Sequence, residues 1–457
     1  MTMRSVSNMS VSNMKGGSTN QPIADLSPRD CGLRIEPLRI ADCGLRIADY
    51  GMQVAECGMR NADYGMRVAD YVDRGLFRSP GIAIPGREVR TCPQGIADLS
   101  PRDSQPTCVA LLLAWALLAL LLGAANPARA DEAAPELARY DAMIDKSVDR
   151  SLAYLAGKQL KDGSFECPMQ GNSGVTSLCV MAFLARGNTP GRGPYGETIN
   201  RGVDFVLANQ KDNGLLVGPA VSHGPMYCHL ISTLMLSEVS GMVVPARQKL
   251  IDAALAKALK LTLAAQQIGK SPAHQGGWRY QHTSGDSDMS VTGWALMGLR
   301  SCRNNGAPVP KQAVEDALNF VMNCRCSDGG FGYTGPAEPL LARTGTALLC
   351  LELCGRHGDK AAISAGNWIL ANLPTRFGGT NFYYGIYYCT QGMFQLGGNY
   401  WQRWAACMYE MMLGSQQADG SWPAGESAEA PAGACYSTAM GVLAMSVSYR
   451  QLPIYQR

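Results

Sequence analysis

A glycine turn recurs six times in the last two thirds of the chain, and it constrains the fold more than any other feature. Successive turns are about 40 to 60 residues apart, the length of a repeat built from two helices. Each turn follows an amphipathic stretch and precedes an apolar one. The turns are Asp162-Gly163-Ser164-Phe165, Asp212-Asn213-Gly214-Leu215, Gly276-Gly277-Trp278, Asp328-Gly329-Gly330-Phe331, Phe377-Gly378-Gly379 and Asp419-Gly420-Ser421-Trp422.

The stretches on either side of a turn have different helical patterns. Before the fourth turn, Val314, Leu318 and Val321 fall at i, i+4 and i+7, which predicts a helix with one apolar face. After it, residues 344–353 carry Glu352 as their only charge, which is typical of a helix buried on every side. Similar apolar stretches cover residues 175–184, 227–236, 291–299, 391–396 and 437–445.

These patterns predict an all-α fold of six helical hairpins, because the alternation typical of strands is nearly absent. A hairpin with one apolar and one amphipathic helix must bury the apolar helix against other hairpins. Six such hairpins close most economically into an α/α toroid. We therefore expect residues 131–457 to form an inner ring of buried helices inside an outer ring of amphipathic ones.

Residues 1–107 do not resemble a folded domain. From Leu38 a seven-residue unit repeats, beginning Leu-Arg-Ile-Ala-Asp-Cys-Gly, and each complete unit ends in Gly. Glycine within a helix is destabilising by roughly 1 kcal/mol relative to Ala, which argues against a coiled coil. The segment is therefore predicted to be a disordered, low-complexity N-terminus, or translated repetitive DNA upstream of the true start.

An export signal is predicted at residues 108–130. The apolar run 109–125 follows Arg102 and ends shortly before Ala128-Arg129-Ala130, which is the pattern of a cleaved secretory signal peptide. The protein is then exported, to the periplasm or out of the cell. The alternative is an uncleaved anchor that associates the protein with a membrane through residues 109–125.

The charge balance argues against a nucleic-acid partner. The 40 basic and 37 acidic residues form no basic stripe of the kind that phosphate backbones require. Sixteen cysteines are scattered along the chain, and eleven of them follow Ala130. Because several lie on helices predicted to be buried, we expect most of these eleven to be reduced packing residues.

The sequence around the glycine turns resembles a known repeat. Gln416-Gln417-Ala418-Asp419-Gly420-Ser421-Trp422, and Gln266-Gln267 ahead of Gly276-Gly277-Trp278, are similar to the repeat of squalene and terpene cyclases and of protein prenyltransferase β subunits. The resemblance covers residues 140–450 and implies an α/α toroid. It also implies that the Gln and the aromatic residue join neighbouring hairpins.

The resemblance further implies an active site in a central cavity, at the loops that lead into the inner helices. An aromatic wall there suits an apolar, isoprenoid-like small molecule, because ring faces stabilise positive charge. An extended peptide or protein is the other expected partner, and the alternative is that the tyrosines only pack the core. The corresponding residues are Asn172, His223, Tyr227, Trp294, Arg343, Tyr383, Tyr384, Tyr387 and Tyr436.

Asp286-Ser287-Asp288-Met289 resembles the acidic motif of squalene-hopene cyclases, in which the middle acid protonates an alkene. The resemblance implies Asp288 as a proton donor with Asp286 beside it, but Met289 stands where the family has another Asp. An alternative role for either acid is to cap the following helix, a contribution of roughly 1 kcal/mol. The helix dipole would favour the ionised form of Asp288, which opposes the role of an acid.

No cofactor or metal is predicted. His223 and His229 are six residues apart and so lie on different faces of a helix, and Cys324-Arg325-Cys326 is too tightly spaced for one face. The function expected is that of an exported repeat protein, non-catalytic or uncharacterised, that binds an apolar or extended ligand in its cavity. A terpene-cyclase-type isomerase is the alternative, and prenyl transfer, which needs zinc, is the weakest.

Overall fold

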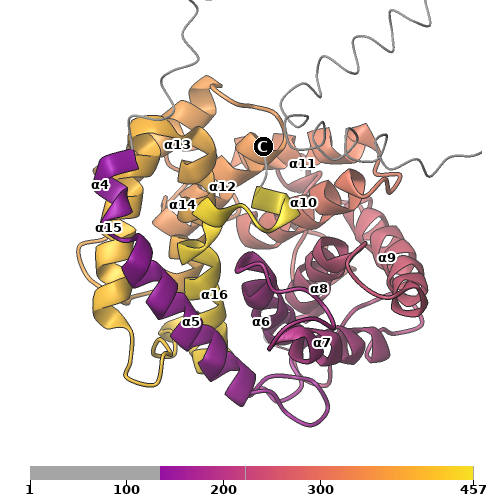
Figure 1. Cartoon of the computed structure of the whole chain (residues 1–457). Helices are drawn as coiled ribbons and strands as arrows, with labels where there is room; N and C mark the ends of the chain where they lie inside the picture. The colour runs from indigo at the N-terminus through magenta and orange to yellow at the C-terminus, as the bar shows by residue number, and fades with distance from the viewer. Residues whose placement is uncertain (1–133, 222, 456–457) are drawn as a thin grey trace, which may run out of the picture. The chain divides into compact units, whose positions relative to one another are not determined.

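The computed structural model describes residues 134–221 and 223–455, which belong to the second of two compact units, Gln105–Arg457. The repeats predicted at residues 1–107 and the export signal predicted at residues 108–130 lie outside the described residues. Figure 1 shows the described part as a ring of helices. These residues contain isolated β-bridges and no β-strand, as the predicted all-α class requires.

Six of the helices in the described residues are buried almost all round and form the inner ring, as predicted. All thirteen residues of α6 are buried, for example, and the sequence of that helix carries no charge. An apolar helix of this kind is stable only inside the protein. The inner helices are α6 (Ser173–Ala185), α8 (Pro225–Val239), α10 (Met289–Asn304), α12 (Leu341–Leu353), α14 (Phe382–Leu396) and α16 (Gly433–Met445).

The helices that alternate with them form the outer ring. In α7 the buried positions include Ile199, Val203 and Val206, whereas Arg201 and Asp204 are exposed, so one face packs inward. The outer helices are α5 (Asp141–Gly157), α7 (Gly196–Ala208), α9 (Pro245–Gln266), α11 (Lys311–Asn323), α13 (Lys360–Ala371) and α15 (Gly398–Ser415). Short helices are α4 (Ala134–Ala138), η1 (Pro272–His274), η2 (Ser427–Ala432), η3 (Val447–Tyr449) and η4 (Pro453–Tyr455).

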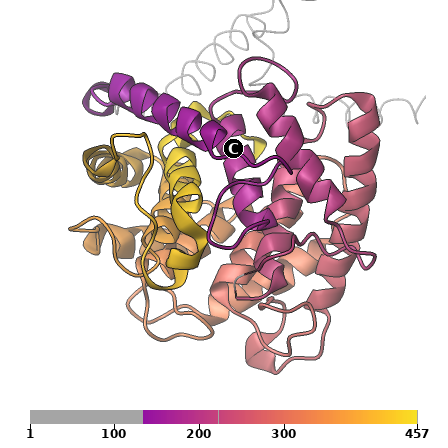
Figure 2. The same ribbon diagram turned by 90° about the horizontal axis from the view of Figure 1, so that it is seen from below.

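The inner ring closes on itself. Each inner helix contacts the next one in sequence, and α16 returns to contact α6. The first outer helix, α5, contacts both α15 and α16, so the two ends of the repeat array meet (Figures 1 and 2). The predicted α/α toroid of six hairpins is confirmed.

The glutamines ahead of the turns join neighbouring hairpins. Nε2 of Gln266 donates to the carbonyl of Gly276 in its own turn and to that of Ala313 in the next outer helix, both at 2.7 Å. The same pair of contacts recurs at Gln159, Gln210 and Gln416. Since Gln416 reaches Ser147 in α5, the last of these contacts closes the ring.

The turns need glycine because the next outer helix lies against them. Gly276 has a φ of +85°, and a Cβ there would lie 2.0 Å from the carbonyl oxygen of Asp316. Any side chain at this position would therefore clash with α11 and strain the backbone. The turn glycines Gly163, Gly214 and Gly420 meet the following outer helix in the same way.

In four repeats a side chain of an inner helix accepts a hydrogen bond from the backbone at the end of the turn. The backbone N–H of Trp278 donates to Oγ1 of Thr292 at 3.1 Å, and that of Trp422 donates to Thr438 at 3.1 Å. In the second repeat His229 takes the place of the threonine: its Nδ1 accepts a hydrogen bond from the N–H of Leu216 at 3.1 Å. Burial lowers the pKa of His229 to about 3, so this histidine is a neutral packing residue.

One inner helix is longer than predicted. The sequence predicts an apolar helix at residues 391–396, but α14 begins at Phe382. Its first two turns are rich in Tyr and Phe, which have lower helix propensity than Leu or Ala, so the pattern resembles a loop. Packing decides the outcome, because Tyr383, Tyr387 and Tyr388 are almost completely buried.

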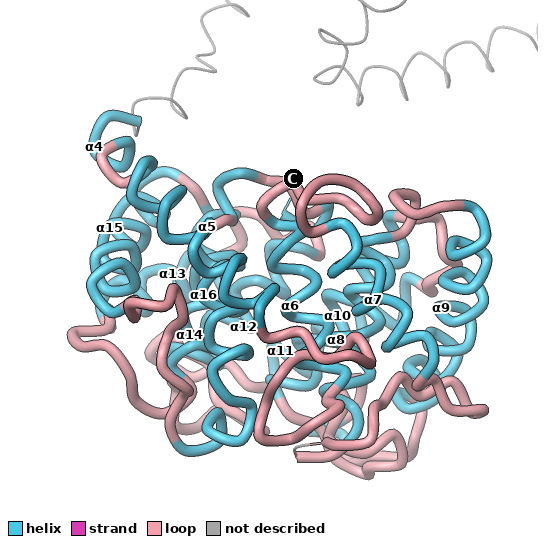
Figure 3. The backbone as a smooth tube through the Cα atoms, turned by 60° about the horizontal axis from the view of Figure 1, so that its bottom comes forward, coloured by secondary structure: helices cyan, strands magenta, loops and turns pink. Residues whose placement is uncertain are grey.

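The two ends of the ring differ. Long loops enter the inner helices at one end, and the C-terminal residues 447–455 cover the other (Figure 3). Leu452 and Ile454 are buried there, and the N–H of Ile454 donates to Oε2 of Glu238 at 3.0 Å.

All eleven cysteines of the described residues are free, eight of them buried, in agreement with the expectation that most are packing residues. None of the helices between Ala134 and Tyr455 combines the length and apolar character that a membrane span requires.

Candidate functional site

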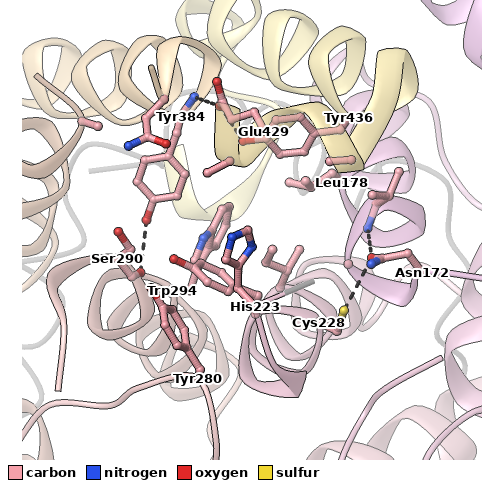
Figure 4. A pocket seen from close by; sticks show the side chains of 18 of the residues that line it. Asn172, Leu178, His223, Cys228, Tyr280, Ser290, Trp294, Tyr384, Glu429 and Tyr436 are labelled. Carbon is pink, nitrogen blue, oxygen red and sulfur yellow. Dashed lines mark hydrogen bonds between the residues drawn. The ribbon is translucent and has the colours of Figure 1, made fainter. Parts of the chain in front are cut away.

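A cavity of about 290 Å³ lies at the end of the ring where the inner helices begin. Its walls come from the first turns of all six inner helices and from the loops before them. Figure 4 shows Tyr384, Trp294 and Tyr436 around one open space. Of the residues predicted to line such a cavity, those on its wall are Asn172, His223, Tyr227, Trp294, Arg343, Tyr384 and Tyr436.

Two predicted cavity aromatics lie elsewhere. The hydroxyl of Tyr383 donates to the carbonyl of Pro423 at 2.6 Å, so this side chain points into the protein. Tyr387 stacks on Trp294 with ring centroids 5.5 Å apart. Neither is part of the cavity wall. Both belong to the core of α14 and support residues that do line the cavity.

The aromatic wall is a connected set of rings. Tyr227 and Tyr280 lie 6.0 Å apart between centroids, and the hydroxyls of Tyr280 and Tyr333 are hydrogen-bonded to each other. The hydroxyl of Tyr384 donates to the carbonyl of Ser290 at 3.1 Å. Burial raises the pKa of Tyr227, Tyr333 and Tyr384, so these rings stay neutral, whereas Arg343 and Glu429 on the same wall are ionisable. The faces of these neutral rings attract positive charge.

Asp288 is completely buried and caps α10. Its Oδ1 accepts from the N–H of Val291 at 2.9 Å, which is the capping role considered from the sequence. Among the described atoms Oδ2 has no hydrogen-bond donor, and it lies 3.6 Å from Nη1 of Arg279. Asp288 is not part of the cavity wall, but its charge affects the pKa of Tyr227, Tyr333 and Tyr384 on that wall.

The start of α10 favours the ionised form of Asp288, as expected, but burial opposes that form more strongly. Burial raises the pKa of Asp288 from 3.8 to about 7, although the Val291 N–H and the Arg279 guanidinium both lower it. Removing a carboxylate from water opposes its charge more strongly than the helix end favours it. Asp288 thus holds a proton through much of the acidic pH range.

Asp286 lies on the loop before α10 with its side chain half exposed. Its Oδ2 is 3.2 Å from Nε of Arg279, and it lies outside the cavity wall. Arg279 also stacks over the rings of Tyr280, at 4.6 Å, and of Tyr333, at 5.4 Å. Asp286 and Asp288 therefore position Arg279, whose guanidinium packs against two rings of the aromatic wall. Met289, which interrupts the acidic motif, is fully buried.

Glu429 lines the cavity and was not predicted from the sequence. It belongs to η2 and accepts from the N–H of Tyr384 at 2.8 Å and from the hydroxyl of Tyr436 at 2.9 Å. Among the residues that the structure describes, it is the one carboxyl on the cavity wall. Burial raises its pKa, while these hydrogen bonds lower it. The short segment Ser427–Ala432 has no periodic pattern that would have indicated this role.

Asn172 has the same structural role at α6 that Asp288 has at α10. Its Oδ1 accepts from the N–H of Val175 at 3.0 Å and lies 3.5 Å from Sγ of Cys228. Both contacts appear in Figure 4. This oxygen is therefore already engaged by the protein on the cavity wall.

Backbone strain gathers in the loops on this side of the ring. His223, Glu338, Asn381 and Ser427 adopt left-handed conformations with φ between 50° and 56°, and they precede α8, α12, α14 and α16. Each such non-glycine residue costs about 1 kcal/mol or more. His223 and Asn381 line the cavity directly. Strain of this kind often marks sites where a ligand binds.

Metal ligands do not gather at this site. Between Ala134 and Tyr455, with Ser222 left aside, no three His, Cys, Asp or Glu side chains converge on one point that could hold a metal ion. His223 lines the cavity and His229 lies in the core, so this pair does not converge.

Residues 203–381 match the family model of the prenyltransferase alpha-alpha toroid domain. This stretch contains the complete inner helices α8, α10 and α12. The resemblance predicted from the glycine turns is therefore confirmed over that part of the chain. No curated protein matches the chain at a significant level.

Solved structures with a similar fold include the type II terpene cyclase MstE from Scytonema without ligand. It is 15% identical over 70% of this chain and 100% of its own, with a TM-score of 0.46. A variant of MstE with geranylgeranyl dihydroxybenzoate is 13% identical over 68% and 99%, with a TM-score of 0.46. A glycosidase variant with glucose is 12% identical over 68% and 98%, with a TM-score of 0.46. Likeness at this level does not assign an activity.

Proposed function

We propose that the cavity binds an apolar, isoprenoid-like small molecule and stabilises positive charge on it. The observation that carries this proposal is a wall of neutral aromatic rings that faces one buried carboxyl, Glu429. Ring faces attract a cation, and a buried carboxylate is its natural counter-ion. The remaining wall includes Val175, Leu178 and Ile231, which suit an apolar chain.

The size of the cavity favours a small ligand. Small-molecule sites are roughly 300–1,000 Å³, and this cavity, at about 290 Å³, lies just below that range. An isoprenoid of a few units fits such a space better than an extended peptide, which was the other partner expected from the sequence.

Binding of short isoprenoids tests this proposal. Farnesol and geranylgeraniol should bind the protein in isothermal titration, and Trp294→Leu should weaken that binding by about tenfold or more, because Trp294 is a buried part of the wall. Trp368→Leu is the matched control, because Trp368 lies on the outer helix α13. Binding that neither substitution changes, or no binding at all, would contradict the proposal.

A cyclase-type isomerase is the second candidate, favoured by the raised pKa of Asp288 beside the cavity. In that reaction the O–H bond of a neutral carboxyl breaks and its proton forms a C–H bond with an alkene carbon. The neighbouring carbon becomes cationic, a second double bond attacks it, and a final C–H proton returns to a carboxylate. Asp288 is the acid in this proposal, although Glu429 lines the cavity and Asp288 does not.

Product analysis separates these candidates. The protein is incubated with squalene and with shorter polyprenyl compounds, and cyclised products are sought by mass spectrometry. Products that disappear in Asp288→Asn but persist in Asp286→Asn would support Asp288 as the acid. Turnover lost only in Glu429→Gln would transfer that role to Glu429, and no turnover in any protein would leave binding as the function.

We also propose that the protein is exported. The support is the sequence pattern at residues 108–130 alone. N-terminal sequencing of the native protein should find a start near Asp131, with the protein in the periplasm or outside the cell. A native N-terminus ahead of residue 108, or a membrane-bound protein that retains the apolar run, would contradict cleavage.

A further inference from the structure

The third repeat has a longer turn than the other repeats in which a glutamine contacts the turn glycine. Gln266 and the carbonyl of Gly276 that it contacts are ten residues apart, whereas the same contact spans four residues at Gln159, Gln210 and Gln416. Together with the outer helix α11, the long turn encloses a pocket of about 400 Å³. This pocket shares no lining residue with the aromatic cavity.

Most of the wall of this pocket is polar. From α11 come Asp316, Asn319 and Asn323, which share one face of the helix because they are spaced at i, i+3 and i+7. The long turn contributes Gln267 and Gln275. The two segments therefore present amide and carboxylate oxygens to one space.

One buried acceptor on this wall has no donor. Nε2 of Gln266 donates to two backbone carbonyls, but among the described atoms its Oε1 accepts no hydrogen bond. Gln266 is only 4% exposed. Proteins rarely leave a buried acceptor without a partner, so this oxygen indicates a donor that the fold itself does not supply.

The first repeat shows which group fits beside this glutamine. There Oε1 of Gln159 accepts a hydrogen bond from the guanidinium of Arg201. Arg201 and Asp316 are at equivalent positions, because the backbone carbonyl of each lies against the turn glycine of its repeat, Gly163 and Gly276. The third repeat thus has a carboxylate at the position of the guanidinium.

The other repeats with this glutamine also have a base at the equivalent position. Lys257 lies there in the second repeat and Arg150 in the sixth. The carboxylate of Asp316 cannot donate to Gln266, and it already accepts from Nε2 of Gln312 at 2.8 Å. An acid in place of the base therefore leaves two acceptors, and no donor between them, on one pocket wall.

The cation on this wall is held elsewhere. Nζ of Lys270 donates to the carbonyls of Ala265 and Gln266 at the end of α9, both at 3.1 Å. Part of the long turn has a structural role, since the carbonyl of His274 accepts from the hydroxyl of Ser287 in the loop before α10. Neither of these two residues lines the pocket, so that role does not account for it.

We propose that this pocket binds a small guanidinium compound with a short apolar chain. Its N–H groups would donate to Oε1 of Gln266 and to the carboxylate of Asp316, in the place that Arg201 fills in the first repeat. Ile268 and Pro272 supply apolar surface for the chain. A volume of about 400 Å³ lies within the range of roughly 300–1,000 Å³ found for small-molecule sites.

Isothermal titration of the full chain at constant ionic strength tests the proposal, with butylguanidinium and butyltrimethylammonium as probes. Both probes carry one positive charge and the same chain, but only butylguanidinium has N–H donors. Butylguanidinium should therefore bind more tightly by about tenfold or more.

Asp316→Arg rebuilds the arrangement of the first repeat, so its own guanidinium should fill the site and weaken the binding of butylguanidinium by about tenfold or more. The matched control is Asp252→Arg on the outer helix α9. Asp252 accepts from Gln248 at 2.7 Å as Asp316 does from Gln312, and it lies outside the pocket wall. This control makes the same change of charge and should leave binding within about twofold of the unmodified protein.

A second measurement needs no variant. In isotope-labelled protein, the side-chain amide signal of Gln266 in the NMR spectrum should shift when butylguanidinium is added. The signal of Gln159, whose Oε1 already accepts from Arg201, should not shift. Absence of butylguanidinium binding, equal binding of the two probes, equal weakening in both variants, or no shift at Gln266 would overturn the proposal.

Discussion

Asp288 and Glu238 form a matched pair at opposite ends of the ring. Burial raises the pKa of each to about 7, from ordinary values of 3.8 and 4.5. Each accepts a backbone N–H, Asp288 from Val291 at 2.9 Å and Glu238 from Ile454 at 3.0 Å. By titration alone the two carboxyls cannot be told apart.

Their surroundings separate them. Both oxygens of Glu238 accept hydrogen bonds, because Oε1 also accepts from Oγ of Ser301 at 2.5 Å. Only one oxygen of Asp288 accepts a hydrogen bond among the described atoms, and the aromatic cavity lies close by. A raised pKa reports burial, so it marks a functional candidate only where a cavity is within reach. Glu238 is a structural carboxyl, and Asp288 is a candidate for chemistry.

Removing Glu238 should have the largest effect. Glu238→Ala leaves the N–H of Ile454 buried without an acceptor, which costs roughly 1–3 kcal/mol, and it removes one of the two acceptors of the Ser301 hydroxyl, the other being Oγ of Ser237 at 2.8 Å. We expect a loss of about 3 kcal/mol in the free energy of unfolding, measured by urea denaturation at pH 5.5, where the folded-state carboxyl is neutral. The C-terminal residues should also become sensitive to carboxypeptidase.

Asp212→Ala is the control, because Asp212 is exposed and lies in a turn. A loss in Glu238→Ala no larger than in this control would mean that Glu238 does not hold the C-terminal segment.

Removing the charge of Asp288 should increase the free energy of unfolding, the opposite of the change expected for Glu238→Ala. Its pKa is higher in the folded than in the unfolded chain, so the folded state binds the extra proton, and this contribution to stability falls as pH rises from about 4 to about 7. Asparagine keeps the cap and removes the charge. Asp288→Asn should therefore be more stable than the unmodified protein by about 2 kcal/mol at pH 8 and nearly unchanged at pH 4.

Urea denaturation at both pH values measures this difference. Glu238→Gln provides the comparison, because an amide cannot accept with both of its terminal groups and should lose stability where Asp288→Asn gains it. Equal changes in the two variants at pH 8 would show that the two ends of the ring are energetically alike.

Substitution of Glu429 tests whether the aromatic cavity stabilises a positively charged ligand. Glu429→Gln should lose about 1 kcal/mol of stability, because the carboxylate accepts N–H groups at the start of α14. Binding of a farnesyl dimethylammonium probe should weaken several-fold more than binding of farnesol, since only the ammonium needs a counter-ion. Glu197→Gln, on the outer helix α7, is the control. If Glu429→Gln weakened the binding of both probes equally, Glu429 would not act as the counter-ion of a bound cation.

The fold was largely predictable because it depends on local features that repeat. A glycine such as Gly276 is required by the close approach of α11, and Gln266 forms the same two contacts in its repeat as Gln159 does in another. Such features leave a pattern in sequence. The start of α14 was missed because tyrosines such as Tyr388 become helical through burial rather than through propensity.

The site was less predictable because it depends on ring closure. Glu429 is far from Tyr384 in sequence, and the two meet only because the hairpins form a closed toroid. The motif identified Asp288 as a candidate acid. It did not predict that Tyr227 and Tyr333 lie near Asp288, or that Asp288 itself lies outside the cavity wall. The family resemblance predicts which loops form the cavity, whereas the packing of the closed ring determines which side chains line it.

The smallest effect is expected at Asp286, which shares Arg279 with Asp288. Its side chain is 49% exposed, and exposed ion pairs contribute roughly 0–1 kcal/mol. Asp286→Asn should change the free energy of unfolding by less than about 0.5 kcal/mol at either pH 4 or pH 8, and should leave isoprenoid binding unchanged. A larger loss of binding would mean that the position of Arg279, and through it the rings of Tyr280 and Tyr333, depends on the exposed acid. The difference between the two acids of the motif would then lie in how each holds Arg279, and not in burial.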